Sequence, residues 1–308
     1  MMVKSESMAK VAECTAGTKV AEGAEGMVSP ELARRVRKAR RSRMAVRAIL
    51  GLELVIVAIP IFVIVVWAFS NSWPWPDLLP QEFTLRGVES VFSANGGKGL
   101  DSLWLSIGIA IAVAVLTTAI AAMGCRAIAH YRWRGKNVFE FLTILPFIIP
   151  STVFAMGVQI VFLSIGLGRT VLGVILAHSI IALPYAMIIL ADVTKAAGIQ
   201  REEAARSLGA NPWQMLCHVT IPSIMPGIIS SLSMCYIMSF SQYFLTLLIG
   251  GGKVNPFVLV LFPYLSGADR TIACAYSLVF LVVTFVVFLA FEVLLRRFGV
   301  KEREGLYE

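Results

Sequence analysis

The hydrophobic positions of this chain fall into six long runs, separated by shorter polar segments. A bilayer core about 30 Å thick needs roughly 20 helical residues at about 1.5 Å each, and every run meets that length. Membrane helices also tolerate the prolines inside the third and fourth runs where neighbouring groups satisfy the freed carbonyls. The pattern therefore predicts an all-α membrane protein with six transmembrane helices. The predicted spans are residues 46–70, 102–125, 138–163, 171–192, 224–249 and 271–295.

Composition supports this interpretation and divides the chain into three parts. Of the 308 residues, 57% are hydrophobic and 15% charged, whereas soluble domains carry about a quarter charged residues. The first run begins too late and is too long for a cleaved signal peptide, so we expect it to be retained as a span. We predict a disordered, basic cytoplasmic tail over 1–45, a transmembrane domain over 46–295 and a second cytoplasmic tail over 296–308.

Lysine and arginine are distributed unevenly between the two sets of connections. One set, which includes both termini, carries 19 of them before the basic residues further up the N-terminal tail are counted, and the opposite set carries 5. The positive-inside rule then predicts that both termini lie in the cytoplasm. The basic run before the first span suits topology and contact with lipid headgroups, so we expect no nucleic-acid partner.

Signals for catalysis or metal binding are missing from the sequence. The three histidines, His130, His178 and His218, are far apart, and the five cysteines form no CxxC pair. The glycines before Lys253 do not make a phosphate-binding loop, because Val254 stands where that motif needs serine or threonine. We therefore predict no catalytic residue, no metal site and no cofactor within this chain.

The connection after the first run has two readings. Trp73, Trp75 and Phe83 suit the aromatic belt at a membrane interface, and the prolines between them stiffen the segment. The same loop could instead be a platform for an external partner. Sequence alone favours the interfacial anchor.

A charged insert over residues 194–222 interrupts the apolar runs. Its first part predicts a helix over 194–208, followed by Gly209 as a residue just past the helix end. Asn211 fits the N-cap of a second short helix with Pro212 at its first position, and Pro222 is expected to stop that helix. The insert is thus predicted to be helix, glycine turn, helix.

Exposed groups on this insert favour a binding face. Glu202 and Glu203 offer carboxylates to basic groups of a partner. Trp213, Met215 and Leu216 add apolar surface that no lipid core would cover in the cytoplasm. An amphipathic loop lying on the headgroups is the alternative.

The insert resembles the EAA motif of ABC-importer permeases of type I, which depend on a binding protein. The resemblance rests on a Glu-Ala-Ala triplet, a glycine four residues later, a terminal Ile-Pro and the position before the penultimate span. It implies a type I importer permease fold in which the insert docks on a cytoplasmic ATPase dimer, and that ATPase would bind ATP and magnesium. The residues expected to couple to the ATPase are Glu203, Ala204, Ala205, Leu208, Gly209, Pro212, Ile221 and Pro222.

Within that family the chain looks most like the second permease subunit of the spermidine/putrescine type, whose relatives move iron, thiamine or aminophosphonates. This likeness implies a multi-pass protein of the bacterial inner membrane that forms half of a translocation pathway. It also implies two further partners, a second permease subunit expected to be a paralogue and a periplasmic solute-binding protein. A polyamine-like or other small solute is expected.

Polar residues in the fifth run are candidates for lining the pathway. Ser239, Gln242 and Tyr243 are spaced to share one helix face. Such groups occur along water-filled paths and equally at contacts between helices, so ordinary interhelical hydrogen bonding stands beside the pathway reading.

Two other classes of function compete with a permease subunit. A stand-alone secondary transporter or channel would be expected to show internal repeats or discontinuous helices, and no repeat is found. A membrane enzyme would need ionisable or nucleophilic groups buried together, and none is found in the runs. We therefore expect a non-catalytic subunit of an ATP-hydrolysing transport complex.

Overall fold

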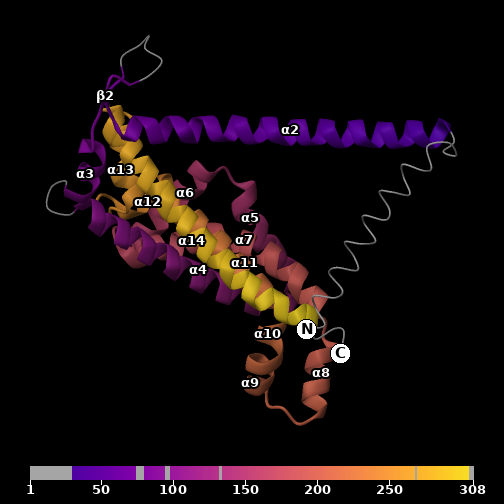
Figure 1. Cartoon of the computed structure of the whole chain (residues 1–308). Helices are drawn as coiled ribbons and strands as arrows, with labels where there is room; N and C mark the ends of the chain where they lie inside the picture. Colours follow the sequence, from indigo (N-terminus) through magenta and orange to yellow (C-terminus); the bar gives the residue numbers. More distant parts are fainter. Residues whose placement is uncertain (1–29, 74–79, 94–97, 132–133, 268, 305–308) are drawn as a thin grey trace, which may run out of the picture. The chain divides into compact units, whose positions relative to one another are not determined.

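The computed structural model describes residues 30–73, 80–93, 98–131, 134–267 and 269–304. These residues are almost entirely helical, with one short two-stranded sheet (Figure 1). The chain divides into two compact units, Met1–Val63 and Ile64–Glu308. The second unit holds the helices that build the core and the insert.

Helix α2 runs from Pro30 to Ala68 without interruption. The predicted disordered tail is therefore wrong over residues 30–45, which are helical. Proline suits the first helical position, where its missing N–H has no partner to lose. The alanines, arginines and lysines that follow are strong helix formers. Residues 1–29 of the predicted tail lie outside the described residues.

Four helical segments are long and apolar enough to cross a membrane, and counting each of two bent helix pairs as one span raises the number to six within the described residues. The six-span prediction agrees with this upper count. The four segments are Val46–Ala68 in α2, Gly99–Ala129 in α4 (Lys98–His130), Val171–Ala197, which is α7, and Arg270–Arg297 in α14 (Arg270–Glu304). Helix α14 continues through most of the predicted C-terminal tail.

The predicted third span is bent rather than straight. Helix α5 (Lys136–Ile148) and helix α6 (Ser151–Ser164) meet at an angle of 107°. Ile149 between them has extended backbone, and Pro150 follows it. A proline disfavours helical backbone in the residue before it, so the helix ends there.

The predicted fifth span is also interrupted. Helix α11 covers Met225–Phe240 and helix α12 covers Phe244–Gly250, with residues 241–243 outside both. The Ser241 hydroxyl donates to the carbonyl oxygens of Ile237 and Met238 at 2.9 and 3.2 Å. Such back-bonding competes with the backbone ladder and favours a break. The expectation that Ser239, Gln242 and Tyr243 share one helix face is therefore wrong.

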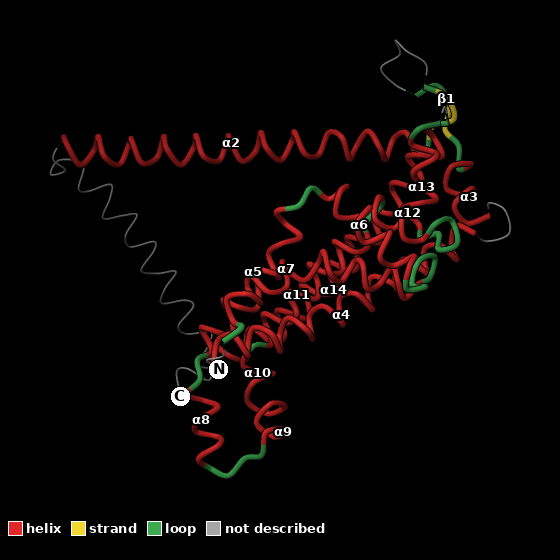
Figure 2. The backbone as a smooth tube through the Cα atoms, turned by 180° about the vertical axis from the view of Figure 1, so that it is seen from behind, coloured by secondary structure: helices red, strands yellow, loops and turns green. Residues whose placement is uncertain are grey.

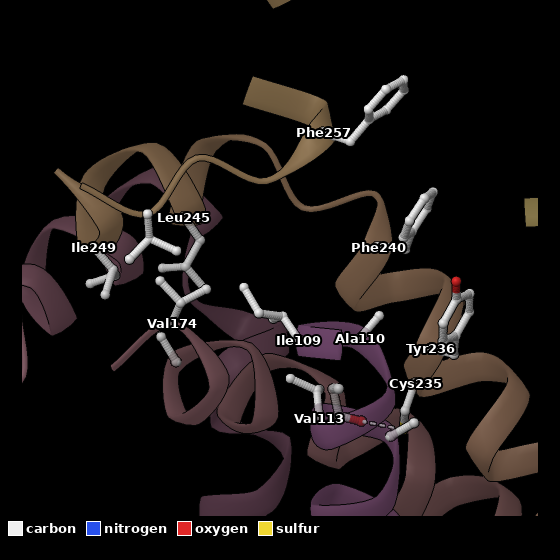
Figure 3. Packing of buried hydrophobic residues seen from close by; sticks show 14 of the residues in the cluster. Ile109, Ala110, Val113, Val174, Cys235, Tyr236, Phe240, Leu245, Ile249 and Phe257 are labelled. Atoms are coloured by element: carbon white, nitrogen blue, oxygen red, sulfur yellow. Dashed lines mark hydrogen bonds between the residues drawn. The ribbon is translucent and has the colours of Figure 1, made fainter. Parts of the chain in front are cut away.

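Helices α4, α7 and α11 pack on one another and form the centre of the second unit (Figure 2). Ala110, Ala177 and Ala182 are fully buried between them, and such small side chains let helix backbones approach closely. Figure 3 shows Ile109, Ala110 and Val113 of α4 within this cluster, together with side chains of α7, α11 and α12. A buried hydroxyl pair, Thr118 and Ser231 at 3.1 Å, joins α4 to α11. The core thus fixes three helices as one body.

One end of the second unit is closed by short elements. Strands β1 (Ser70–Ser72) and β2 (Glu82–Phe83) pair antiparallel, next to helix α3 (Arg86–Ser93) and helix α13 (Phe257–Leu265). Trp73 stacks on Trp67 with ring centroids 5.2 Å apart, whereas Trp75 lies outside the described residues. An Arg86–Asp269 ion pair of 2.8 Å ties α3 to the chain just before α14.

The charged insert lies at the opposite end of the second unit. It comprises α8 (Gln200–Ser207), α9 (Pro212–Met215), the π-helix η1 (Leu216–Thr220) and α10 (Ile221–Ser223). Figures 1 and 2 both show α8 and α9 extending away from the helix bundle as two arms joined by a turn.

Candidate functional site

The tip of the insert is a helix–turn–helix closed by local hydrogen bonds. Gly209 adopts φ +85°, a left-handed conformation that glycine accepts readily. The Asn211 side chain accepts from the Gln214 N–H at 2.8 Å, and the Gln214 side chain accepts from the Asn211 N–H at 3.0 Å. Pro212 occupies the first turn of α9. The predicted glycine turn, the cap and the proline position are confirmed.

The connections of the insert differ from the prediction at both ends. The expected helix over 194–208 is divided, because α7 ends at Ala197 and Gly198 adopts φ +68° before α8 begins. On the return path, the chain does not stop at Pro222 but continues helically to Ser223 and bends by 72° into α11. Proline falls in the first turn of α10, where its missing N–H is tolerated.

Most of the residues expected to couple to an ATPase are exposed. Leu208 is 89% exposed and Trp213 72% exposed, although both are large apolar residues. Apolar side chains of that size left in water favour a contact surface. Met215 is 3% exposed, so its expected place on the surface is wrong. Of the expected set, Glu203, Ala204, Leu208, Gly209, Pro212 and Pro222 are exposed, and Ala205 and Ile221 are half-buried.

Glu202 does not face outward as expected. Its carboxylate accepts from Arg126 Nε at 3.1 Å and from Arg126 Nη2 at 2.9 Å. The Thr220 hydroxyl donates to the same carboxylate at 2.6 Å. Successive helix residues are rotated by about 100°, so adjacent carboxylates on α8 point in different directions. That geometry was the signal in the sequence that could have separated Glu202 from Glu203.

The three pathway candidates lie in three different environments. Ser239 is buried, and its Oγ lies 2.9 Å from Nδ1 of His178 on α7. Tyr243 stacks on Phe262 of α13 with ring centroids 3.9 Å apart. Gln242 lines a cavity of about 440 Å³. Of the three, Gln242 is the one that lines this cavity.

His178, one of the three scattered histidines, has a structural role that its place in the sequence does not indicate. Its Nε2 lies 2.9 Å from Thr246 Oγ1, which donates its proton to the Gln242 carbonyl. Thr246 therefore accepts from Nε2–H, and Nδ1 is left to accept from the Ser239 hydroxyl. The imidazole thus joins α7 to both sides of the break between α11 and α12.

The cavity beside Gln242 lies between α5, α6, α7 and the broken α11–α12 pair. Pro146, Pro150 and Phe154 supply one wall, and Tyr185 and Gln242 add polar groups. The described residues that line it include no aspartate, glutamate, lysine or arginine. The cavity can therefore contact a solute through apolar and neutral polar groups from this chain.

Comparison with known proteins gives the family. Residues 120–300 match the family described as binding-protein-dependent transport system inner membrane component. The chain is 23% identical over 252 residues to a putative 2-aminoethylphosphonate transport system permease protein of Salmonella paratyphi A, covering 81% of this chain and 93% of that protein. It is 24% identical over 173 residues to the putrescine transport system permease protein PotI of Escherichia coli strain K12, covering 53% and 62%.

A solved structure supports the same fold. A chain of a bacterial ABC transporter involved in the import of the acidic polysaccharide alginate aligns with a TM-score of 0.65 and 19% identity, covering 83% of this chain and 97% of that chain. The family match includes α8, α9 and the broken α11–α12 pair, so the candidate site lies within it. This chain belongs to the binding-protein-dependent transport system inner membrane components, the permease subunits of ABC importers.

Proposed function

We propose that this permease subunit transmits ATP-driven movement through the insert formed by α8, α9, η1 and α10. The observation that carries the proposal is the exposed tip, where Leu208 and Trp213 lie on either side of the turn between two projecting arms. Glu203, in the first turn of α8, is an exposed carboxylate on the same arm as Leu208. An apolar tip with an adjacent charge suits a cleft on a folded protein partner. Glu203, Ala204, Leu208, Gly209, Pro212 and Trp213 would form that contact.

The partner is proposed to be a cytoplasmic ATPase dimer that binds ATP and magnesium itself. The charge asymmetry of the connections supports a cytoplasmic position for the insert and both termini. A second permease, expected to be a paralogue, would complete the pathway, and a periplasmic binding protein would deliver solute. Each permease subunit would then move as a rigid body when the two ATPase subunits close on each other.

The transported solute is proposed to be small, and the relatives do not agree on its charge. Their names include an aminophosphonate and the diamine putrescine, and the solved neighbour imports an acidic polysaccharide. The uncharged wall around Gln242 favours a path in which this subunit does not hold the solute by an ion pair. Selectivity would then rest with the binding protein.

The test is ATP hydrolysis by the complex in lipid vesicles. The full chain is copurified with its ATPase, second permease and binding protein, and putrescine, spermidine, 2-aminoethylphosphonate, thiamine and ferric iron serve as probes. One loaded binding protein is expected to stimulate hydrolysis. A chain that never copurifies with an ATPase would instead support the stand-alone transporter or channel.

Glu203→Lys tests the docking contact directly. Reversing the charge at a protein interface typically costs about 2 kcal/mol or more, so ATPase copurification is expected to fall by about tenfold or more. Glu89→Lys on α3, at the other end of the second unit, is the matched control and should copurify normally. Equal copurification of the two variants would contradict docking through the tip.

A further inference from the structure

One carboxylate joins three elements at the base of the insert. Arg126 lies near the end of α4, Glu202 is in α8 and Thr220 ends η1. The guanidinium makes a two-point contact with the carboxylate, at 3.1 Å to Oε1 and 2.9 Å to Oε2. The Thr220 hydroxyl donates to Oε1 at 2.6 Å. We call these three residues the base clamp.

The base clamp is largely shielded from water. The Arg126 side chain is 22% exposed and the Glu202 side chain 9% exposed. Charge-assisted, two-point contacts between arginine and carboxylate are geometrically specific, and shielding strengthens them. Loss of either partner would leave a charged group poorly compensated.

Both covalent connections of the insert to the bundle depart from a straight helix. On the entry side, Gly198 interrupts the helix with φ +68°. On the exit side, the helix axis turns by 72° at Ile224. Without a further contact, a push on the tip could rotate the insert about these two bends instead of moving the bundle.

The base clamp adds a connection from the insert to a third helix, α4. Helix α4 is not next to the insert in the sequence, since Arg126 and Glu202 are 76 positions apart. It packs along both α7 and α11, so a displacement of α4 displaces the core. The contact therefore connects the insert to the centre of the molecule independently of the two bends.

We propose that the base clamp positions the insert on α4 and carries the movement of the docked tip into the core. This inference rests on the proposed function, because it presumes that the ATPase moves the tip. Glu202 and Arg126 are positioning residues here, distinct from Glu203, which would touch the ATPase. This division of roles predicts that substitutions of the two adjacent glutamates impair the complex in different ways.

The functional test compares Glu202→Gln with Glu203→Gln in the reconstituted complex, using whichever solute of the panel stimulates the unmodified complex. Solute moved per ATP hydrolysed is measured and normalised to assembled complex. For Glu202→Gln, copurification with the ATPase is expected to be unchanged, while this ratio falls by about fivefold or more, the lower range of coupling between sites. For Glu203→Gln, copurification should fall instead.

A charge exchange provides the rescue that a general folding defect would not show. Arg126→Glu alone should lower the transport ratio, and combining it with Glu202→Arg should restore at least part of it. A normal ratio in Glu202→Gln, a loss of assembly in that variant, or no recovery in the exchange would each overturn the base clamp. Failure of the unmodified complex to assemble would instead overturn the proposed function.

A distance measurement tests the clamp without any solute. Spin labels are attached at Ser207→Cys on α8 and Ala129→Cys on α4, with the native cysteines replaced. The distribution of distances is expected to be narrow in this background and in Glu203→Gln, and to broaden in Glu202→Gln. A narrow distribution in Glu202→Gln would show that the insert is held without the clamp.

Discussion

Two adjacent glutamates of α8 illustrate how much depends on the direction of a single side chain. Glu202 is buried against Arg126 and Thr220, and Glu203, in the same first turn of α8, is exposed. Substitutions that treat the doublet as one acidic patch would mix an internal contact with an external one. The two proposed roles, docking and positioning, therefore separate at the scale of single residues.

Gly209 gives a second prediction at this scale. Its φ of +85° costs other residues about 1–2 kcal/mol, while nothing lies within 4 Å of an added Cβ. Gly209→Ala is therefore expected to disturb the angle between α8 and α9 through the backbone alone, and to lower ATPase copurification with membrane insertion intact.

The control for that variant is Gly108→Ala in α4. An added Cβ there also meets nothing within 4 Å, and the helical backbone suits alanine. It should leave copurification and insertion unchanged. Equal effects of the two variants would show that the positive φ of Gly209 has no special importance.

At the scale of elements, the break between α11 and α12 is held by buried polar groups rather than by helix continuity. His178 contacts Ser239 before the break and Thr246 after it, each at 2.9 Å. Gln242, which lies in the break, is among the residues that line the cavity. Through Thr246, His178 on α7 is thus linked to the backbone carbonyl of this candidate pathway residue.

His178→Ala should therefore reduce stability. Interhelical hydrogen bonds in membranes average about 0.6 kcal/mol, and a buried group left unpaired costs about 1–3 kcal/mol. We expect the free energy of unfolding, measured by denaturation in detergent, to fall by about 1–3 kcal/mol.

Ser179→Ala is the matched control, because the Ser179 hydroxyl donates to Ile175 of its own helix at 2.8 Å. Its effect should stay within about 0.5 kcal/mol. If Ser179→Ala lowers the free energy of unfolding as much as His178→Ala does, the hydrogen bonds of His178 across the break do not contribute specially to stability.

How far the sequence predicts these elements depends on what each one requires. Apolar length was enough for α4, α7 and α14, because a span needs little else. The cap at Asn211 and the turn at Gly209 were predicted from local chemistry, and both are confirmed. The breaks at Gly198 and Ser241 were not predicted, because apolar periodicity carries no information about the backbone conformation of a single residue. The contact of Arg126 was not predicted, because its partner Glu202 is distant in the sequence.

For the whole molecule, the orientation in the membrane remains a prediction from charge. Eight lysines and arginines lie between residues 34 and 47, just before the first span and at its start. Replacing them with glutamine is expected to lower the fraction of molecules with a cytoplasmic C-terminus.

A fluorescent protein fused to the C-terminus reports that fraction, because it matures in the cytoplasm, and an alkaline phosphatase fusion reports the opposite side. Lys253→Gln, in the opposite set of connections, should leave both signals unchanged. Strong phosphatase activity from the unmodified chain would contradict the predicted orientation.

The hydrogen bonds between Asn211 and Gln214 have a consequence for how the complex assembles. They are made within the turn itself, so the tip has its shape without help from another protein. A segment that is ordered beforehand loses little conformational entropy when it binds, whereas a segment that folds on contact loses much more. The proposed docking on an ATPase would then require no folding of the tip at the moment of binding.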